Sequence, residues 1–155
     1  MKKAENNKKP LVVAVSGGFD PVHIGHVRMF NEAKKLGDKL VVILNNDNWL
    51  KNKKGEPFMP EAERKEILEA LAAVDEVVLT SHPEIVTDTS VCAELEKIRP
   101  DIFANGGDRR NPDEIPSLES VVCNKHNIKM VFNIGHGGKV QSSSWLVNKQ
   151  KNNKK

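Results

Sequence analysis

Short runs of β-branched and aliphatic residues alternate along this chain with stretches that have the apolar spacing of helices. Five runs favour strands, at residues 11–15, 40–44, 77–80, 102–104 and 129–132. Between them, Val91, Leu95 and Ile98 are spaced as on one helix face, and the Pro100 that follows ends that helix. Strands connected through helices pair in parallel. We therefore predict a single Rossmann-like, doubly wound α/β domain, with a five-stranded parallel sheet and helices on both faces.

The Asn- and Lys-rich ends differ in composition from the rest of the chain. The formal net charge is +3, but eight of the 24 basic residues lie in residues 1–10 and 149–155, where Glu5 is the only acid. Such polar ends are typical of disordered tails, so we expect the folded domain to span residues 11–148. That domain holds more acidic than basic residues, which argues against a nucleic-acid partner, although the tails leave salt-dependent binding open.

Two further features bear on the compartment. The sequence has no apolar stretch as long as a membrane span, and its first residues have no apolar signal core. We therefore expect a cytoplasmic protein with no membrane partner. Cys92 and Cys123 form no C-x-x-C motif and are interpreted as packed thiols.

Polar segments follow four of the five predicted strands, at residues 16–26, 45–54, 105–109 and 135–144, and three of the four contain glycines. The carboxyl ends of parallel strands meet at one edge of the sheet, and ligands of doubly wound domains bind there. This edge, the carboxyl rim, is therefore the predicted site.

The segment S-G-G-F-D-P-V-H-I-G-H, residues 16–26, is the most unusual of the four. Gly17 and Gly18 permit close approaches that a side chain would block. His23 and His26 can share one face at the start of a helix, where exposed N–H groups suit a phosphate. A zinc site is the alternative, but no third ligand is close in sequence, so we expect no protein metal site. The G-x-G-x-x-G and P-loop motifs are absent.

The same segment resembles the G-x-F-D-x-x-H-x-G-H signature of the cytidylyltransferase-like nucleotidyltransferases. Residues 36–47 and 50–78 are similar to the heptose-1-phosphate adenylyltransferases and the glycerol-3-phosphate cytidylyltransferases. The pair Pro100-Asp101, followed by Gly106-Gly107-Asp108, resembles the first group more. The resemblance covers about residues 11–147.

This resemblance implies transfer of a nucleotidyl group from a nucleoside triphosphate to a sugar or polyol phosphate, with Mg²⁺ as cofactor, release of pyrophosphate and a homodimer. The implied catalytic residues are His23, His26, Lys53 on a mobile loop, and Arg64. The implied nucleotide contacts are the two histidines with Gly17, Gly18, Phe19, Asp20, Asn105, Gly106, Asp108, Lys139, Ser142, Ser143 and Ser144. The implied acceptor contacts are Lys51, Lys54 and Arg109.

Several alternatives stay open at this point. Phe19 can instead pack in the turn, and Asp20 can fix the turn by hydrogen bonds to the backbone. Many relatives have R-x-x-x-I-S-[ST]-[ST] near the last helix, whereas this chain has G-G-K-V-Q-S-S-S, with Lys139 as its only cation. A nucleotide-binding regulator without turnover therefore remains an alternative. We expect ATP to be preferred over CTP, because residues 106–108 resemble the adenylyltransferases.

Overall fold

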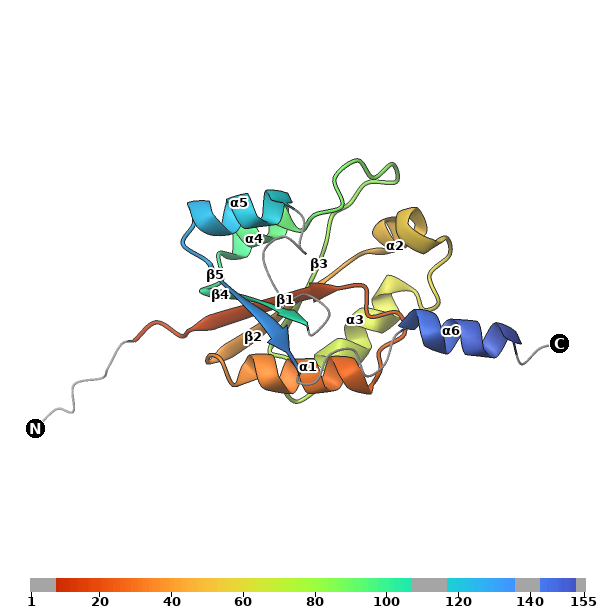
Figure 1. The fold of residues 1–155 in the computed structure, drawn as a ribbon, viewed down its shortest axis with the longest axis horizontal. Helices are drawn as coiled ribbons and strands as arrows, with labels where there is room; N and C mark the ends of the chain where they lie inside the picture. Colours follow the sequence, from red (N-terminus) through yellow and green to blue (C-terminus); the bar gives the residue numbers. More distant parts are fainter. Residues whose placement is uncertain (1–7, 107–116, 136–142, 153–155) are drawn as a thin grey trace, which may run out of the picture.

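The computed structural model describes residues 8–106, 117–135 and 143–152 (Figure 1). Strands and helices alternate along them. The strands are β1 (Val12–Gly17), β2 (Lys39–Leu44), β3 (Glu76–Leu79), β4 (Ile102–Gly106) and β5 (Lys129–Ile134). The helices are α1 (Ile24–Lys34), α2 (Asp47–Lys54), α3 (Glu61–Glu69), α4 (Cys92–Ile98), α5 (Ser117–Lys125) and α6 (Ser143–Asn152).

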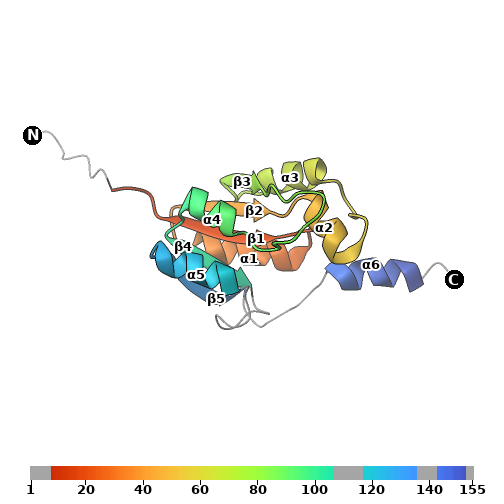
Figure 2. The ribbon, with the colours of Figure 1, turned by 90° about the horizontal axis from the view of Figure 1, so that it is seen from above.

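All five strands pair in parallel in the order β3-β2-β1-β4-β5. Figures 1 and 2 show α1 and α3 on one face of the sheet and α4 and α5 on the other, with α2 and α6 at the carboxyl rim. The predicted α/β fold with a five-stranded parallel sheet is therefore confirmed. The chain order reverses between β1 and β4, which makes their carboxyl ends the switch point of this sheet.

The sheet separates two hydrophobic cores, because alternate side chains of a strand point to opposite faces. Val13, Val15 and Leu40 pack with Phe30 of α1 and Leu68 of α3. On the other face, α4 and α5 pack against the sheet. The buried residues of this second core, from the strands, these helices and their ends, are Ala14, Ile43, Val91, Leu95, Phe103, Cys123 and Ile128. Burial raises the pKa of the Cys123 thiol to about 11, as fits a packed thiol.

Two segments differ from the sequence-based prediction. Residues 47–54 form helix α2 instead of a mobile loop, with Asn46 as the N-cap residue that accepts a hydrogen bond from the Trp49 N–H. Helix α6 continues to Asn152, so four residues of the segment expected to be a disordered tail are helical. Among the described residues, no helix is long and apolar enough to cross a membrane.

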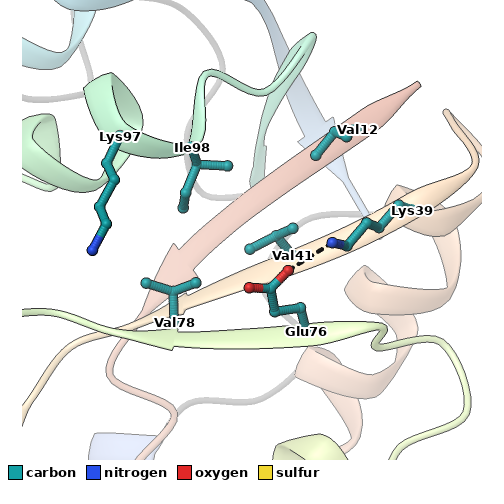
Figure 3. A pocket seen from close by; sticks show the side chains of 7 residues that line it. All are labelled: Val12, Lys39, Val41, Glu76, Val78, Lys97 and Ile98. Carbon is teal, nitrogen blue, oxygen red and sulfur yellow. Dashed lines mark ion pairs between the residues drawn. The ribbon is translucent and has the colours of Figure 1, made fainter. Parts of the chain in front are cut away.

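A cavity of about 370 Å³ lies near the amino ends of β1, β2 and β3, beside the last turn of α4 (Figure 3). Valine side chains line its floor, and the Lys39–Glu76 ion pair, 2.7 Å between Nζ and Oε2, lies at its edge. The residues of the conspicuous motifs lie at the opposite ends of these strands. The candidate site therefore lies at the carboxyl rim.

Candidate functional site

The first turn of α1 is fixed by the two histidines of the sequence motif. His23 is the N-cap residue, and its Nδ1 accepts a hydrogen bond from the Gly25 N–H at 3.1 Å. The His26 Nδ1 accepts from the His23 backbone N–H at 3.2 Å, which completes a capping box built from two imidazoles. The two rings stack, with centroids 3.7 Å apart and planes 22° from parallel.

This cap determines where each imidazole carries its proton. A neutral imidazole has one protonated nitrogen, and Nδ1 is the acceptor in both rings, so the proton lies on Nε2. Burial and the neighbouring His23 lower the pKa of His26 to about 3, which keeps this ring neutral at physiological pH. The helix N-terminus thus presents N–H donors that do not depend on imidazolium formation.

The lowered pKa of His26 predicts how stability depends on pH. An unfolded chain, with a pKa near 6.5, binds a proton at His26 that the folded protein does not bind until about pH 3. Acidification from pH 6.5 toward 3 therefore favours unfolding. His26→Asn does not titrate here, and its Oδ1 can replace Nδ1 as the cap acceptor. Between pH 7.5 and 4.5, we expect the melting temperature to fall about 5 °C further in the wild type than in this variant. Equal slopes would contradict the lowered pKa.

Gly17 and Gly18 are required by the packing of other side chains. A Cβ on Gly17 would lie 2.8 Å from the Phe19 ring, and one on Gly18 would lie 2.9 Å from a Leu50 methyl group. Phe19 itself has a φ of 49° and is buried, with its ring edge-on to His26 at 4.8 Å between centroids. Phe19 therefore supports the His26 ring by packing, and only its backbone is left for a phosphate.

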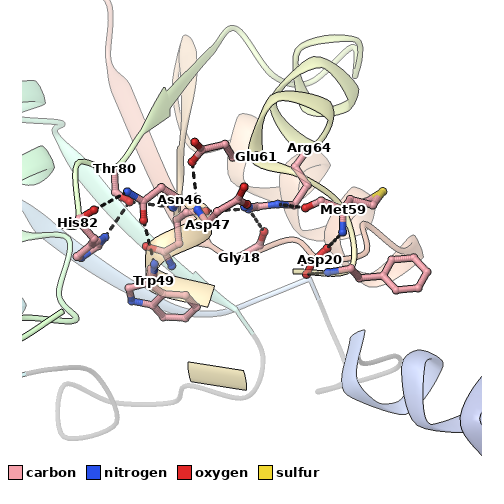
Figure 4. Close-up of polar contacts among 12 residues, drawn as sticks. Gly18, Asp20, Asn46, Asp47, Trp49, Met59, Glu61, Arg64, Thr80 and His82 are labelled. Atoms are coloured by element: carbon pink, nitrogen blue, oxygen red, sulfur yellow. Dashed lines mark hydrogen bonds and ion pairs between the residues drawn. The ribbon is translucent and has the colours of Figure 1, made fainter. Parts of the chain in front are cut away.

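Asp20 fixes the turn after α2. Its Oδ2 accepts from the Phe58 N–H and its Oδ1 from the Met59 N–H, both at 2.7 Å (Figure 4). Lys54 lies 3.3 Å from the same carboxylate and also donates to the Asp20 carbonyl. Because Asp20 is only 1% exposed and its carboxylate accepts from residues 58 and 59, it fixes the segment after α2 rather than its own turn as the sequence alternative expected, and Lys54 is tied to the same segment.

Arg64 does not face the rim as the resemblance implied, because its side chain is 0% exposed. Its Nε donates to the Met59 carbonyl and its Nη1 to the carbonyls of Gly18 and Asn45, at 2.7–2.9 Å. Its Nη2 pairs with the Asp47 carboxylate at 2.7 Å. Figure 4 shows the Arg64 side chain with its hydrogen bonds to Met59, Gly18 and Asp47. Arg64 is therefore a positioning residue that joins the end of β1, the end of β2 and the start of α2.

The lysine run lies on α2, and its members have different surroundings. Lys54 holds Asp20, whereas the Lys53 Nζ lies 4.8 Å from the centroid of the Trp49 ring. Lys51 is exposed. The three lysines therefore have different surroundings: Lys54 is tied to Asp20, Lys53 lies by the Trp49 ring, and Lys51 is exposed.

The other side of the switch point is described in part. Asn105 is buried at the end of β4, where its Nδ2 donates to the carbonyls of Phe103 and Val131 at 3.5 Å, and Gly106 ends the strand. The Ser143 hydroxyl donates to the Pro21 carbonyl at 2.8 Å, so the start of α6 lies beside the histidine turn. Ser144 lies in the first turn of α6. Asp108, Arg109, Lys139 and Ser142 lie outside the described residues.

Sequence reasoning missed the contacts around the ends of β2 and β3. The Trp49 indole Nε1 donates to the Thr89 carbonyl at 2.9 Å, and His82 bridges Thr80 and Ser90 through its two ring nitrogens. The Asn45 side chain is buried, and its Oδ1 has no hydrogen-bond partner in the described structure. An asparagine in a polar segment after a strand carries no signal of this kind in a single sequence.

The described residues do not form a protein-only magnesium site. Across residues 8–106, 117–135 and 143–152, no three His, Cys, Asp or Glu side chains are grouped as a metal site would need. The two rim carboxylates are engaged elsewhere, Asp20 by backbone N–H groups and Asp47 by Arg64. Mg²⁺ often binds proteins through substrate phosphates, so a magnesium ion bound in that way stays an expectation from the sequence.

Comparison with known proteins places this geometry in a family. The profile of the cytidylyltransferase-like family matches residues 14–153. An FAD synthase from Ferroglobus placidus is 43% identical over 102 residues, which are 66% of this chain and 62% of that protein. An FAD synthase from Thermococcus onnurineus is 40% identical over 111 residues, or 71% of this chain and 69% of that protein. The chain thus spans somewhat under two thirds of the length of several of these relatives.

A bifunctional protein HldE from Hydrogenovibrio crunogenus is 41% identical over 117 residues, which are 74% of this chain and 23% of that protein. Among solved structures, the lipopolysaccharide core biosynthesis protein from Thermoplasma volcanium superimposes with a TM-score of 0.67 and 27% identity. That match covers 84% of this chain and 99% of that one. Sequence, fold and the histidine turn therefore agree, and the chain belongs to the cytidylyltransferase-like family.

Proposed function

We propose that this protein is an adenylyltransferase that transfers AMP from ATP to the phosphate of a small acceptor. An acceptor phosphate oxygen attacks the α-phosphorus of ATP, the bond from that phosphorus to the bridging oxygen of the β-phosphate breaks, and pyrophosphate leaves. The observation that carries the proposal is the histidine cap. It supports two Nε2–H donors at a helix N-terminus, where the charge of a transferring phosphate would need stabilisation.

The reaction needs no general base. The second pKa of a phosphate monoester is about 6, so the attacking oxygen is already ionised near pH 7. Placement of two anions and neutralisation of their charge are then the main requirements. His23 and His26 would donate to the triphosphate, and Lys53 and Lys51 of α2 would approach the phosphates from the β2 side. Mg²⁺ would arrive with the triphosphate, since the rim carboxylates are engaged by protein groups.

The relatives support ATP as the donor. FAD synthases and the bifunctional protein HldE both match this chain at about 40% identity. FAD consists of FMN joined to AMP, so the name of the first group is consistent with adenylyl transfer from ATP. The nucleotide base would lie near Asn105 and Gly106, at the β1–β4 switch point. The acceptor would be a small phosphorylated compound such as a sugar phosphate or FMN.

A matrix of ATP and CTP against FMN, a hexose 1-phosphate and glycerol 3-phosphate tests this function. We expect pyrophosphate release with ATP and at least one acceptor, with a kcat/KM at least about tenfold above that with CTP. A higher kcat/KM with CTP and glycerol 3-phosphate would assign a cytidylyltransferase instead. Tight nucleotide binding without pyrophosphate release from any pair would favour a regulator that lacks turnover.

A further inference from the structure

The Trp49 indole spans two loops of the carboxyl rim. Its six-membered ring lies 3.6 Å from the place of a Cβ on Gly18, in the turn after β1. Its Nε1 donates to the carbonyl of Thr89, which precedes α4. The Lys53 ammonium lies 4.8 Å from the ring centroid. The indole is thus oriented on three sides, although the residue is only partly buried.

A second, independent feature lies directly before α2. Asn45 is 4% exposed, and its Oδ1 has no hydrogen-bond partner among the described residues. Its backbone is fully used, since the N–H donates to the Gly17 carbonyl and the carbonyl accepts from Arg64. A buried carbonyl oxygen without a donor is costly, so a complex that supplies a donor is favoured.

The strand register places these two features together. Asn45 continues the β2 ladder beyond Leu44, and side-chain alternation puts it on the same face as Ile43, which packs in the α4 core. Thr89, the partner of the indole, also lies on the α4 side because it leads into that helix. Both features therefore lie over β2 and β3, next to the Gly18 turn.

We infer that Asn45 and Trp49 form the acceptor subsite, which takes a phosphorylated compound with hydroxyl groups and a ring. The inference rests on the proposed function, because it assumes that the nucleotide base occupies the β1–β4 switch point. With the phosphates at the histidine turn, the acceptor then extends over β2 and β3. The Asn45 Oδ1 accepts a hydrogen bond from an acceptor hydroxyl, and the indole packs against the ring.

Two kinds of acceptor have a phosphate, hydroxyl groups and a ring. A sugar phosphate has hydroxyls on its ring, and FMN has them on the chain between its phosphate and a flat flavin. The two differ in how strongly they depend on the indole, because a flat aromatic ring stacks on it and a sugar ring makes a smaller apolar contact.

The indole is tested with three variants. Trp49→Ala removes it, Trp49→Phe keeps an aromatic ring, and Trp145→Phe removes the other tryptophan as a control. We expect Trp49→Ala to raise the acceptor KM about tenfold, with the ATP KM within twofold of wild type. Trp49→Phe should recover most of this loss. Quenching of FMN fluorescence by wild type and Trp145→Phe, but not by Trp49→Ala, would identify a flavin acceptor; a KM effect without quenching would identify a sugar phosphate.

Asn45 is tested by pairing a variant with a changed substrate. We compare kcat/KM for whichever of FMN and the hexose phosphate is the better acceptor with kcat/KM for its deoxy analogue, in which hydrogen replaces the hydroxyl groups. We expect the wild type to prefer the hydroxylated compound by about tenfold or more in kcat/KM, and Asn45→Ala to lose that preference. A change limited to melting temperature, with the preference intact, would show that Asn45 is only structural and would overturn its assignment.

The outcomes separate this inference from the proposed function. If pyrophosphate is released but the acceptor KM and the hydroxyl preference are unchanged in both alanine variants, the subsite is wrong and the function stands. If no acceptor gives pyrophosphate, the proposed function fails, and the subsite fails with it unless Trp49→Ala weakens FMN or hexose phosphate binding by calorimetry.

Discussion

His26→Asn should lower kcat by roughly 10²–10³-fold and leave the melting temperature at pH 7.5 nearly unchanged. The asparagine Oδ1 can accept the His23 N–H in place of Nδ1, so the helix cap is kept. The variant has no N–H at the position of Nε2, and one preorganised donor to the transferring phosphate is lost. Steady-state pyrophosphate release and thermal unfolding measure the two quantities separately.

His26→Gln is the matched control. Glutamine at this third helical position is a standard capping-box residue, so its Oε1 can accept the His23 N–H, and its side-chain amide N–H can approach the position of Nε2. We expect this variant to keep more activity than His26→Asn at a similar melting temperature, because both side chains keep the cap and only glutamine can supply an N–H near Nε2. If both variants turn over at nearly the wild-type rate, the Nε2–H of His26 has no part in phosphate stabilisation.

The fold could be predicted from the sequence because its signals are local and periodic. The β-branched runs and the i, i+4, i+7 spacing of Val91, Leu95 and Ile98 correspond to the five strands and to α4. Helix α2 was not predicted because it has almost no apolar face. Only Leu50 among its eight residues is buried, and the helix is set instead by the Asn46 cap and the Asp47–Arg64 pair. Neither contact has a periodic signature.

The site could be predicted in its location and only partly in its roles. Parallel topology alone brings the four polar segments to one rim. The role of a charged residue depends on which groups surround its side chain. Those groups come from segments that are distant in the sequence. Asp20 binds backbone groups 38 and 39 residues away, and Arg64 reaches Gly18 over 46 residues. A motif records that such residues are present without recording whether they face the ligand or the interior.

Arg64→Ala should lower the free energy of unfolding by about 3–5 kcal/mol, the usual cost of removing one partner from a buried ion pair. It leaves the Asp47 carboxylate and the carbonyls of Met59, Gly18 and Asn45 without their donor. Arg64→Lys should recover only part of the loss, because one ammonium lacks the fork that reaches all four groups. Lys65→Ala is the control on the same helix. Its pair with Glu69 is exposed, at 3.8 Å, so we expect a change within about 0.5 kcal/mol.

Urea unfolding measures these differences, provided that the slope of free energy against urea is the same in each variant. Steady-state kinetics can distinguish a positioning role of Arg64 from a direct catalytic role. Arg64 holds the Gly18 turn and the start of α2 together, so Arg64→Lys should disturb both substrates, raising the KM of ATP and of the acceptor while kcat falls less. An Arg64→Ala protein as stable as the wild type, with a kcat reduced by 10²-fold or more, would show instead that the guanidinium turns to the phosphates during the reaction, as the family resemblance implied.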